Sequence, residues 1–146
     1  MSELKSELIF EYEGEVAFPE VLEPSHAGSR MFYFLKGGTV KGPRVKGTLL
    51  PGGGDWPLLR GDGASEIDAR LVIKTDDGAL IYAHYRGIAV MSPDIATRIQ
   101  SNEKVDPSEY YFRTTPVFET GAQKYAWLNQ VICVGVGTFE PGRVSY

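Results

Sequence analysis

Short apolar runs recur along the whole chain, and glycine, proline or polar residues separate them at fairly even intervals. The stretch "ELIFEYEGEV" alternates from Leu8 through Phe10 to Tyr12, which is the period-two pattern of a strand with one buried face. "SRMFYFLKGGTVKGP" predicts a second strand over residues 31–35, which ends at the glycines 37–38. This punctuation is typical of an antiparallel all-β domain.

The clearest local signal is a hairpin in "SEIDARLVIKTDDGALIYAHYRGIAV". Two strand-like runs, residues 67–74 and 79–90, flank "TDDG", whose Asp-Gly pair suits the positive φ of a tight turn. We therefore interpret Asp76 and Asp77 as turn residues, because aspartate favours hairpin loops through local hydrogen bonds.

Alternation along this hairpin sorts its side chains into two faces. Asp68 and Arg70 share one face of the first strand, and Ile67 lies on the other. On the partner strand Tyr85 and His84 lie on opposite faces. The pattern does not tell which face points inward, so both faces are candidates for a pocket lining.

The second half of the chain predicts one short helix among further strands. In "MSPDIATRIQSN", Ser92 is a good N-cap and Pro93 suits the first helical position, so we expect a helix near 93–100. "YYFRTTPVFET" and "QKYAWLNQVICVGVGTFE" predict two long strands, and "GRVSY" predicts a short edge strand.

These elements add up to about eight to ten strands in a single domain spanning residues 1–146. So many strands in so short a chain favour closure, because closure removes the exposed sheet edges. We therefore predict an all-β fold, a single antiparallel β-barrel with room for a small ligand. A two-sheet sandwich is the alternative.

Charge and hydropathy exclude several classes of function. The net charge is −4 and the basic residues are scattered, which argues against a nucleic-acid partner. No run approaches the roughly 18 apolar residues of a membrane-spanning helix. The start, "MSELKSELIF", lacks the pattern of a signal peptide, so we expect a cytoplasmic protein. The single cysteine, Cys133, is expected to be a buried, inert thiol.

Known cofactor motifs are also missing from the sequence. His26 and His84 are isolated, with no cysteine or acid at ligand spacing, so no metal site is expected. "PGGGDW" and "GPRVKG" match neither the phosphate-loop nor the dinucleotide pattern, since neither opens a helix after a strand. We expect no cofactor.

The stretch "LLPGGGDWPLLRGDG" is instead of interest for its acidic residue Asp55, which directly follows three glycines. Glycines 52–54 permit backbone conformations closed to other residues and are expected to place Asp55 and Trp56 at the barrel rim. Burial beside Trp56 would raise the pKa of Asp55 toward the value that a general base needs near neutral pH. Asp68 is the second candidate acid or base. Unlike Asp76 and Asp77, neither Asp55 nor Asp68 is fully explained as a turn residue.

Arg113 stands among aromatic residues and threonines in "YYFRTTP". Its guanidinium group would hold a carboxylate or enolate oxygen through two hydrogen bonds. Alternatively, it would form an ion pair with Glu119 or Asp68 across the sheet.

In the late predicted strand, Tyr125, Trp127 and Asn129 share one face. Such a mixed polar and aromatic face suits a cavity wall, and it equally suits a solvated outer face.

Four separated motifs occur in the order seen in one protein family: "GTVKGPRVKGTLLPGGGDW", "DARLVIKTDDGALIYAHYRG", "YYFRTTPVFET" and "YAWLNQVICVGVG". From about Arg30 to its C-terminus the chain resembles the DUF3237 family, also called UPF0311. The resemblance implies a small antiparallel β-barrel of lipocalin-like shape. It further suggests a cofactor-free isomerase, lyase or cyclase that acts on an oxygenated organic molecule.

The family's motif residues correspond here to Asp55, Trp56, Asp68, Arg70, Tyr85, Arg113, Glu119, Tyr125, Trp127 and Asn129. The first hypothesis is an enzyme acting on an aromatic or enolisable carbonyl compound, with Asp55 or Asp68 moving a proton and Arg113 stabilising an oxyanion. Tyr85, Trp127 and the other motif residues would bind this small organic ligand. The second hypothesis is a non-catalytic carrier or sensor of a hydrophobic molecule, and the third is a homodimer built through a barrel face.

Overall fold

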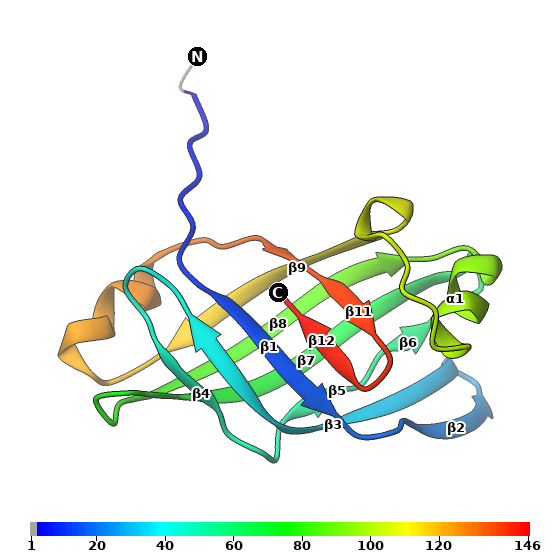
Figure 1. Ribbon diagram of the computed structural model, residues 1–146, viewed down its shortest axis with the longest axis horizontal. Coiled ribbons are helices and arrows are strands. Elements are labelled where there is room, and N and C mark those ends of the chain that lie inside the picture. The colour runs from blue at the N-terminus through cyan, green and yellow to red at the C-terminus, as the bar shows by residue number, and fades with distance from the viewer. Residues whose placement is uncertain (1–2) are drawn as a thin grey trace.

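The computed structural model describes residues 3–146, which form twelve strand segments, one α-helix and two 3-10 helices (Figure 1). The strands are β1 (Glu11–Val16), β2 (Glu20–Ser25), β3 (Gly28–Lys41), β4 (Gly47–Leu49), β5 (Gly54–Asp55), β6 (Leu58–Leu59), β7 (Ala64–Thr75), β8 (Leu80–Val90), β9 (Tyr111–Glu119), β10 (Gly135–Val136), β11 (Thr138–Glu140) and β12 (Arg143–Ser145). The helices are α1 (Pro93–Gln100), η1 (Pro107–Glu109) and η2 (Gln123–Gln130).

All of these strands belong to one antiparallel sheet, whose main path runs β10-β9-β8-β7-β4-β3-β1-β12-β11. The two ends of this path, β10 and β11, are separated only by Gly137, whose N–H donates to the Phe112 carbonyl at 2.9 Å. The sheet therefore curls into a partial ring, and Figure 1 shows β1 and β12 in front of β7 and β8. The predicted all-β, barrel-like fold is confirmed, and the two-sheet sandwich is wrong.

The predicted hairpin and the predicted helix are both present. β7 and β8 pair along their whole length, and Gly78 in the connecting turn has a φ of +90°. Helix α1 begins as expected, because the Ser92 side chain accepts a hydrogen bond from the Ile95 N–H and Pro93 occupies the first turn.

The single long strand predicted for residues 123–140 is wrong, because η2 occupies the first part of this segment and only the short strands β10 and β11 follow. The Asn129 side chain accepts from the Thr120 N–H and donates to its carbonyl, both at 2.9 Å, which draws the chain back toward the end of β9. The Tyr125 hydroxyl donates to Asp77 in the β7–β8 turn at 2.9 Å. Leu128 is fully buried, so η2 covers one end of the barrel. Tertiary contacts have overridden the strand-like alternation.

Glycines 37–38 do not end a strand as predicted, since β3 continues through them. A Cβ atom on Gly38 would lie 2.1 Å from the Glu13 carbonyl oxygen. Glycine at this position therefore permits the close approach of β1 and β3.

The barrel interior is packed at the end covered by η2. The largest fully buried side chains there come from β7, β8, η2 and the loop before β4: Ile73, Ile81, Leu128 and Val45. At the other end, α1 packs against the sheet through Ile95 and Ile99, and the interior is hollow. No helix in the described part of the chain is long and apolar enough to cross a membrane.

Candidate functional site

A cavity of about 330 Å³ occupies the hollow end of the barrel, between the sheet and α1. Most of its wall is apolar and includes Met31, Met91, Phe112, Phe139 and Val144. A concave, mainly apolar site with a few polar groups is typical of small-molecule binding.

The polar groups of the cavity are concentrated on one row of the sheet. Asp55 pairs in register with Tyr33 on one side and with Ala69 on the other, and Ala69 pairs in turn with Tyr85. Asp55, Tyr33 and Tyr85 all line the cavity. Beyond this row, toward η2, the interior side chains Leu71 and Ala83 are buried. The row therefore forms the inner end of the cavity, and Asp55 lies there rather than at the predicted rim.

The glycine run positions Asp55. Gly52 has a φ of +106°, a conformation that side chains disfavour. Cβ atoms on Gly53 and Gly54 would lie 2.4 Å from the Arg70 carbonyl oxygen and 2.3 Å from the Tyr33 carbonyl oxygen, respectively. The three glycines thus let β5 fit between β3 and β7, which points the Asp55 side chain into the barrel.

Burial raises the pKa of Asp55 to about 7. This value also includes smaller contributions: hydrogen bonds from the Asp68 and Trp56 backbone N–H groups lower the pKa, and the negative charge of Asp68 raises it. The Asp68 N–H lies 3.0 Å from Asp55 Oδ1. Asp55 therefore exchanges a proton near neutral pH from a fixed position, as a general acid or base requires.

Three tyrosines meet next to Asp55. The Tyr12 hydroxyl donates to the Tyr85 hydroxyl at 2.7 Å, and the Tyr146 ring packs against Tyr85 and Tyr12 with centroids 5.2 and 5.1 Å away. Burial raises the pKa of all three, and the charge of Asp55 adds to the shift. Tyr33 behaves in the same way. These hydroxyls stay protonated at neutral pH. The Tyr12 hydroxyl donates to Tyr85 and the Tyr33 hydroxyl donates to the Met31 sulfur, whereas the Tyr85 hydroxyl, on the cavity lining, can donate to an oxygen of a ligand.

Asp68 and Arg70 lie on the outer face of β7, away from the cavity. The Asp68 carboxylate is 3.5 Å from Arg70, 3.3 Å from His84 and 4.0 Å from Arg86, all by nitrogen–oxygen distance. The alternation pattern correctly predicted that Asp68 and Arg70 share one face of the strand. The structure shows that this face is exposed to solvent. Only the backbone of Asp68 reaches Asp55.

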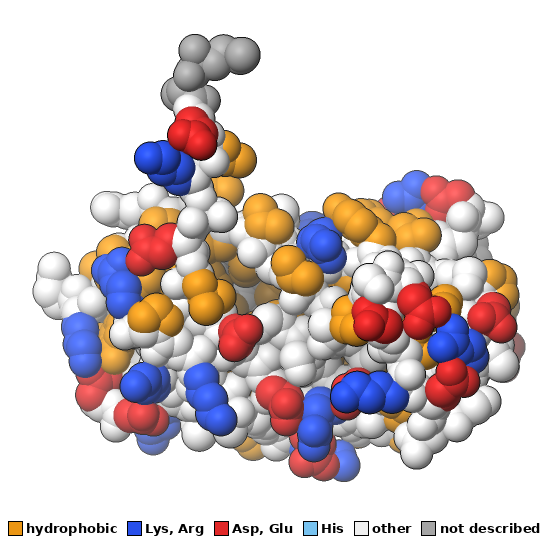
Figure 2. Space-filling model, turned by 45° about the horizontal axis from the view of Figure 1, so that its top comes forward, with side chains coloured by type: hydrophobic (Ala, Val, Ile, Leu, Met, Phe, Trp, Pro, Cys, Tyr) orange, Lys and Arg blue, Asp and Glu red, His pale blue; other side chains and the backbone are white. Residues whose placement is uncertain are grey.

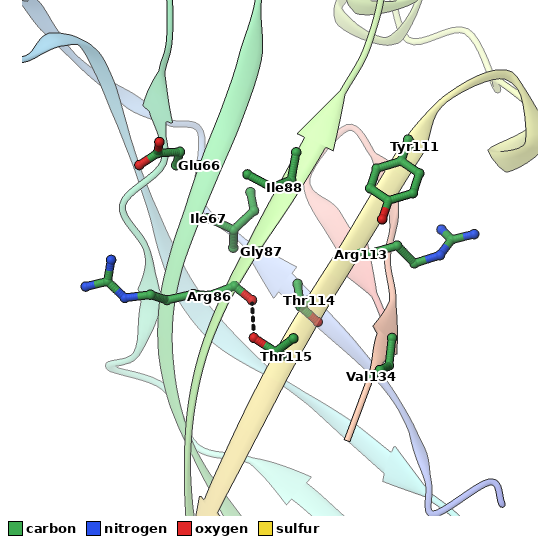
Figure 3. A pocket seen from close by; sticks show the side chains of 10 residues that line it. All are labelled: Glu66, Ile67, Arg86, Gly87, Ile88, Tyr111, Arg113, Thr114, Thr115 and Val134. Atoms are coloured by element: carbon green, nitrogen blue, oxygen red, sulfur yellow. Dashed lines mark hydrogen bonds between the residues drawn. The ribbon is translucent and has the colours of Figure 1, made fainter. Parts of the chain in front are cut away.

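Arg113 lies beside a groove on the outer face of β7, β8 and β9 (Figure 3). Its guanidinium group donates to the Phe112 carbonyl at 2.9 Å and packs over the Tyr111 ring at 5.1 Å. Neither Glu119 nor Asp68 is its partner, so the predicted ion pair is wrong. Arg113 does not reach the interior cavity.

The residues from the late predicted strand also lie outside the cavity. Trp127 in η2 stacks against Arg44, whose guanidinium carbon is 3.7 Å from the ring centroid. Tyr125 and Asn129 hold η2 in place, as described above. The prediction that Arg113, Trp127 and Asn129 face one shared cavity is therefore wrong, because it depended on a strand that does not form.

Trp56 and Glu119 complete the predicted set. The backbone of Trp56 donates to the Asp68 carbonyl at 3.1 Å and accepts from Arg30 at 3.1 Å, and its side chain is absent from the cavity lining. Glu119 is exposed at the end of β9, opposite Tyr82. Of the ten predicted residues, the structure brings Asp55 and Tyr85 together in the cavity.

The sequence reasoning missed several lining residues and also Tyr12, which contacts the lining residue Tyr85. Tyr12 and Tyr33 carried a usable signal, because both fall in strand-like alternating segments. Phe139 and Tyr146 carried none, since they lie in and directly after the short C-terminal strands, whose place in the sheet depends on the long-range pairing of β12 with β1. Among residues 3–146, no group of three His, Cys, Asp or Glu side chains is placed to hold a metal ion.

Fold and cavity together define a barrel-like β-protein with an acid and a tyrosine cluster in its interior. The chain belongs to the family described as "Protein of unknown function (DUF3237)", whose model matches residues 4–146. It is 40% identical over 117 residues to a UPF0311 protein of Clostridium acetobutylicum, covering 80% of this chain and 74% of that protein.

Two solved structures are similar over nearly the whole chain. A conserved protein of unknown function from Rhodopseudomonas palustris has a TM-score of 0.93 and 32% identity, covering 99% of this chain and 95% of that one. A beta-barrel like protein from Acinetobacter baumannii has a TM-score of 0.81 and 36% identity, covering 94% and 89%.

A more distant relative has a named activity. The hydroalkoxylation enzyme phnH of Penicillium herquei is 29% identical over 116 residues, which cover 79% of this chain and 62% of that enzyme.

Proposed function

We propose that this protein is an enzyme that transfers a proton on an oxygenated, largely apolar small molecule bound in the barrel cavity. The observation that carries the proposal is the position of Asp55: a carboxyl group with a pKa of about 7, next to Tyr85 at the inner end of an apolar cavity. Perturbed acids in clefts are frequent at catalytic sites.

The geometry divides the chemistry between two side chains. At neutral pH both forms of Asp55 are populated, so it can remove a proton from a carbon or hydroxyl and return one to a carbon. The Tyr85 hydroxyl, supported by Tyr12, would donate a hydrogen bond to the carbonyl or phenol oxygen on which negative charge develops. Tyr85 thus takes the role that the sequence suggested for Arg113.

This chemistry falls in the isomerase, lyase or cyclase type. The named activity of the Penicillium relative supports it, because hydroalkoxylation adds an O–H bond across a carbon–carbon double bond. Such an addition takes one proton from the hydroxyl oxygen and delivers one to an alkene carbon, so no net proton is consumed. A single carboxyl group that accepts and donates near neutral pH can perform both transfers.

The test measures proton transfer directly. A panel of enolisable aromatic ketones and alkenyl phenols is incubated with the protein in deuterated water, and deuterium incorporation and ring closure are followed by NMR. We expect turnover of at least one compound, and Asp55→Asn should reduce it by about 10²-fold or more. Glu119→Gln, which changes an exposed acid far from the cavity, should leave it unchanged.

A carrier would behave differently in the same experiment. It would bind panel members without accelerating exchange or addition, and Asp55→Asn would alter affinity alone. Compounds that bind in the cavity, detected by NMR shifts of Phe112 and Phe139, but are never converted would contradict the enzymatic role.

A further inference from the structure

The segment 131–136 exposes apolar side chains that its sequence, "VICVGV", predicts to be buried. Ile132 is 99% exposed, Val134 71% and Val136 54%. Within the described residues, β10 pairs with β9 on one side only. A partly unpaired, apolar sheet edge of this kind is a liability unless something covers it.

The exposed segment borders the outer groove, which has a volume of about 600 Å³. Ile88, Tyr111 and Val134 lie along it, and the exposed Val90 pairs in register with Tyr111. Val134 belongs to both, so the groove continues the apolar surface of residues 131–136. Figure 2 shows the upper and front sides of the molecule as it stands in Figure 1, where hydrophobic side chains are also exposed, mainly over the upper part of the face in view.

Two of the charged residues that line the groove, Glu66 and Arg113, lie on opposite sides of Ile88. One row of paired residues crosses five strands in the order Leu58, Glu66, Ile88, Arg113 and Val136. Glu66 and Arg113 are therefore each one strand away from Ile88, about 5 Å to either side. Figure 3 shows them on opposite sides of Ile88.

This row is complementary to itself. When two copies face each other across a twofold axis that runs along β8, Glu66 of each copy meets Arg113 of the other. The same rotation brings Leu58 against Val136. The order apolar, acid, apolar, base, apolar therefore gives opposite charges and matched apolar positions at every step of the row.

We propose that this outer face, Leu58 to Val136 across β6–β10, is the interface of a homodimer. The partner copy covers the edge segment and fills the groove, and it supplies Arg113 with a carboxylate. Within one copy the Arg113 guanidinium contacts an uncharged carbonyl oxygen and the Tyr111 ring. Near the axis, Arg86 would face the equivalent arginine of the other copy. Its side chain points away from Ile88 in Figure 3, however, and the Asp68 carboxylate lies 4.0 Å from its guanidinium group.

Charge reversal tests both the interface and its symmetry. Sedimentation velocity from low to high micromolar concentration should show a reversible dimer of the wild-type protein. Glu66→Arg and Arg113→Glu should each weaken dimerisation by at least about tenfold, because like charges then face each other. An equimolar mixture of the two variants should recover a heterodimer, in which both facing pairs again have opposite charges.

Further variants separate the interface from general effects of surface charge. Ile132→Asp and Val134→Asp should produce monomers with unchanged circular dichroism, since both side chains are exposed in one copy. Lys74→Glu, elsewhere on the outer face, and Phe18→Asp, which is 92% exposed outside the groove, should remain dimeric. A wild-type protein that stays monomeric, a dimer indifferent to the groove variants, or a mixture that fails to recover overturns the proposal.

Discussion

Asp55 and Tyr85 lie on either side of Ala69, because Ala69 pairs in register with both residues. Ala69 is buried and carries only a methyl group, so no larger side chain stands between Asp55 and Tyr85 in this row of the sheet. Both side chains line the same cavity, so one ligand bound there can contact the acid and the hydrogen-bond donor. Two residues that are far apart in the sequence can therefore act on the same bound molecule.

The first prediction concerns Tyr85. Tyr85→Phe removes the hydrogen bond to the ligand oxygen and should lower turnover of an identified substrate by about 10- to 100-fold. Tyr82→Phe is the matched control, because Tyr82 lies on the same strand but opposite Glu119 on the outer face. Steady-state kinetics of the two variants decides the matter. Equal effects of both changes would contradict the assigned role.

The second prediction concerns stability and pH. The pKa of Asp55 is raised to about 7 in the folded state, so the folded protein binds the extra proton between the unfolded value and 7. Its favourable contribution is therefore complete below the unfolded pKa and is lost as the pH rises through about 7. Asp55→Asn cannot lose a proton. As the pH rises from about 4 to about 8, the free energy of unfolding of Asp55→Asn should therefore increase relative to that of wild type by on the order of 3 kcal/mol.

Urea unfolding of both proteins at the two pH values measures this difference. The comparison isolates Asp55 because other acids, such as Asp62 and Asp106 with their lowered pKa values, are present in both proteins. Parallel pH profiles for wild type and variant would show that Asp55 titrates normally.

The third prediction concerns the coupling of Asp68 to Asp55. The outward-facing Asp68 carboxylate raises the pKa of Asp55 through its charge, while its backbone N–H lowers it. Asp68→Asn removes the charge and keeps the N–H, so the pKa of Asp55 should fall. Carboxyl ¹³C NMR titration measures the shift. The control is Asp94→Asn, an exposed change in α1 that should leave the titration of Asp55 where it was.

Local patterns predicted a large part of the fold. The β7–β8 hairpin and α1 followed from a turn sequence and an N-cap whose effects need no distant contacts. The segment around Asn129 failed for the opposite reason. Its alternation suits a strand, but the two hydrogen bonds of Asn129 to Thr120 fix it beside β9 as a 3-10 helix.

The site was predictable only in part. Asp55 could be found because glycines 52–54 and a following acid form an unusual combination, and Tyr85 because it lies in a clear hairpin strand. The contact of Tyr12 with Tyr146 joins opposite ends of the chain through the pairing of β1 with β12. Alternation cannot distinguish inside from outside, which is why Asp68 and Arg70 were assigned to the pocket together with Tyr85.

The last prediction tests whether the glycine run serves the site. Gly54→Ala would place a Cβ atom 2.3 Å from the Tyr33 carbonyl oxygen, so β5 must move. We expect a loss of about 2 to 3 kcal/mol in the free energy of unfolding. The displacement should also expose Asp55 and lower its pKa toward the ordinary range.

Gly61→Ala is the matched control: a Cβ there meets no atom within 4 Å, so the free energy of unfolding should change by less than about 1 kcal/mol. Urea unfolding gives the stabilities, and ¹³C titration of Asp55 gives the pKa. If Gly54→Ala lowered stability but left the pKa of Asp55 near 7, the glycines would serve the sheet alone. A fall in both quantities, absent in Gly61→Ala, ties the backbone of residues 52–54 to the acid that they place in the cavity.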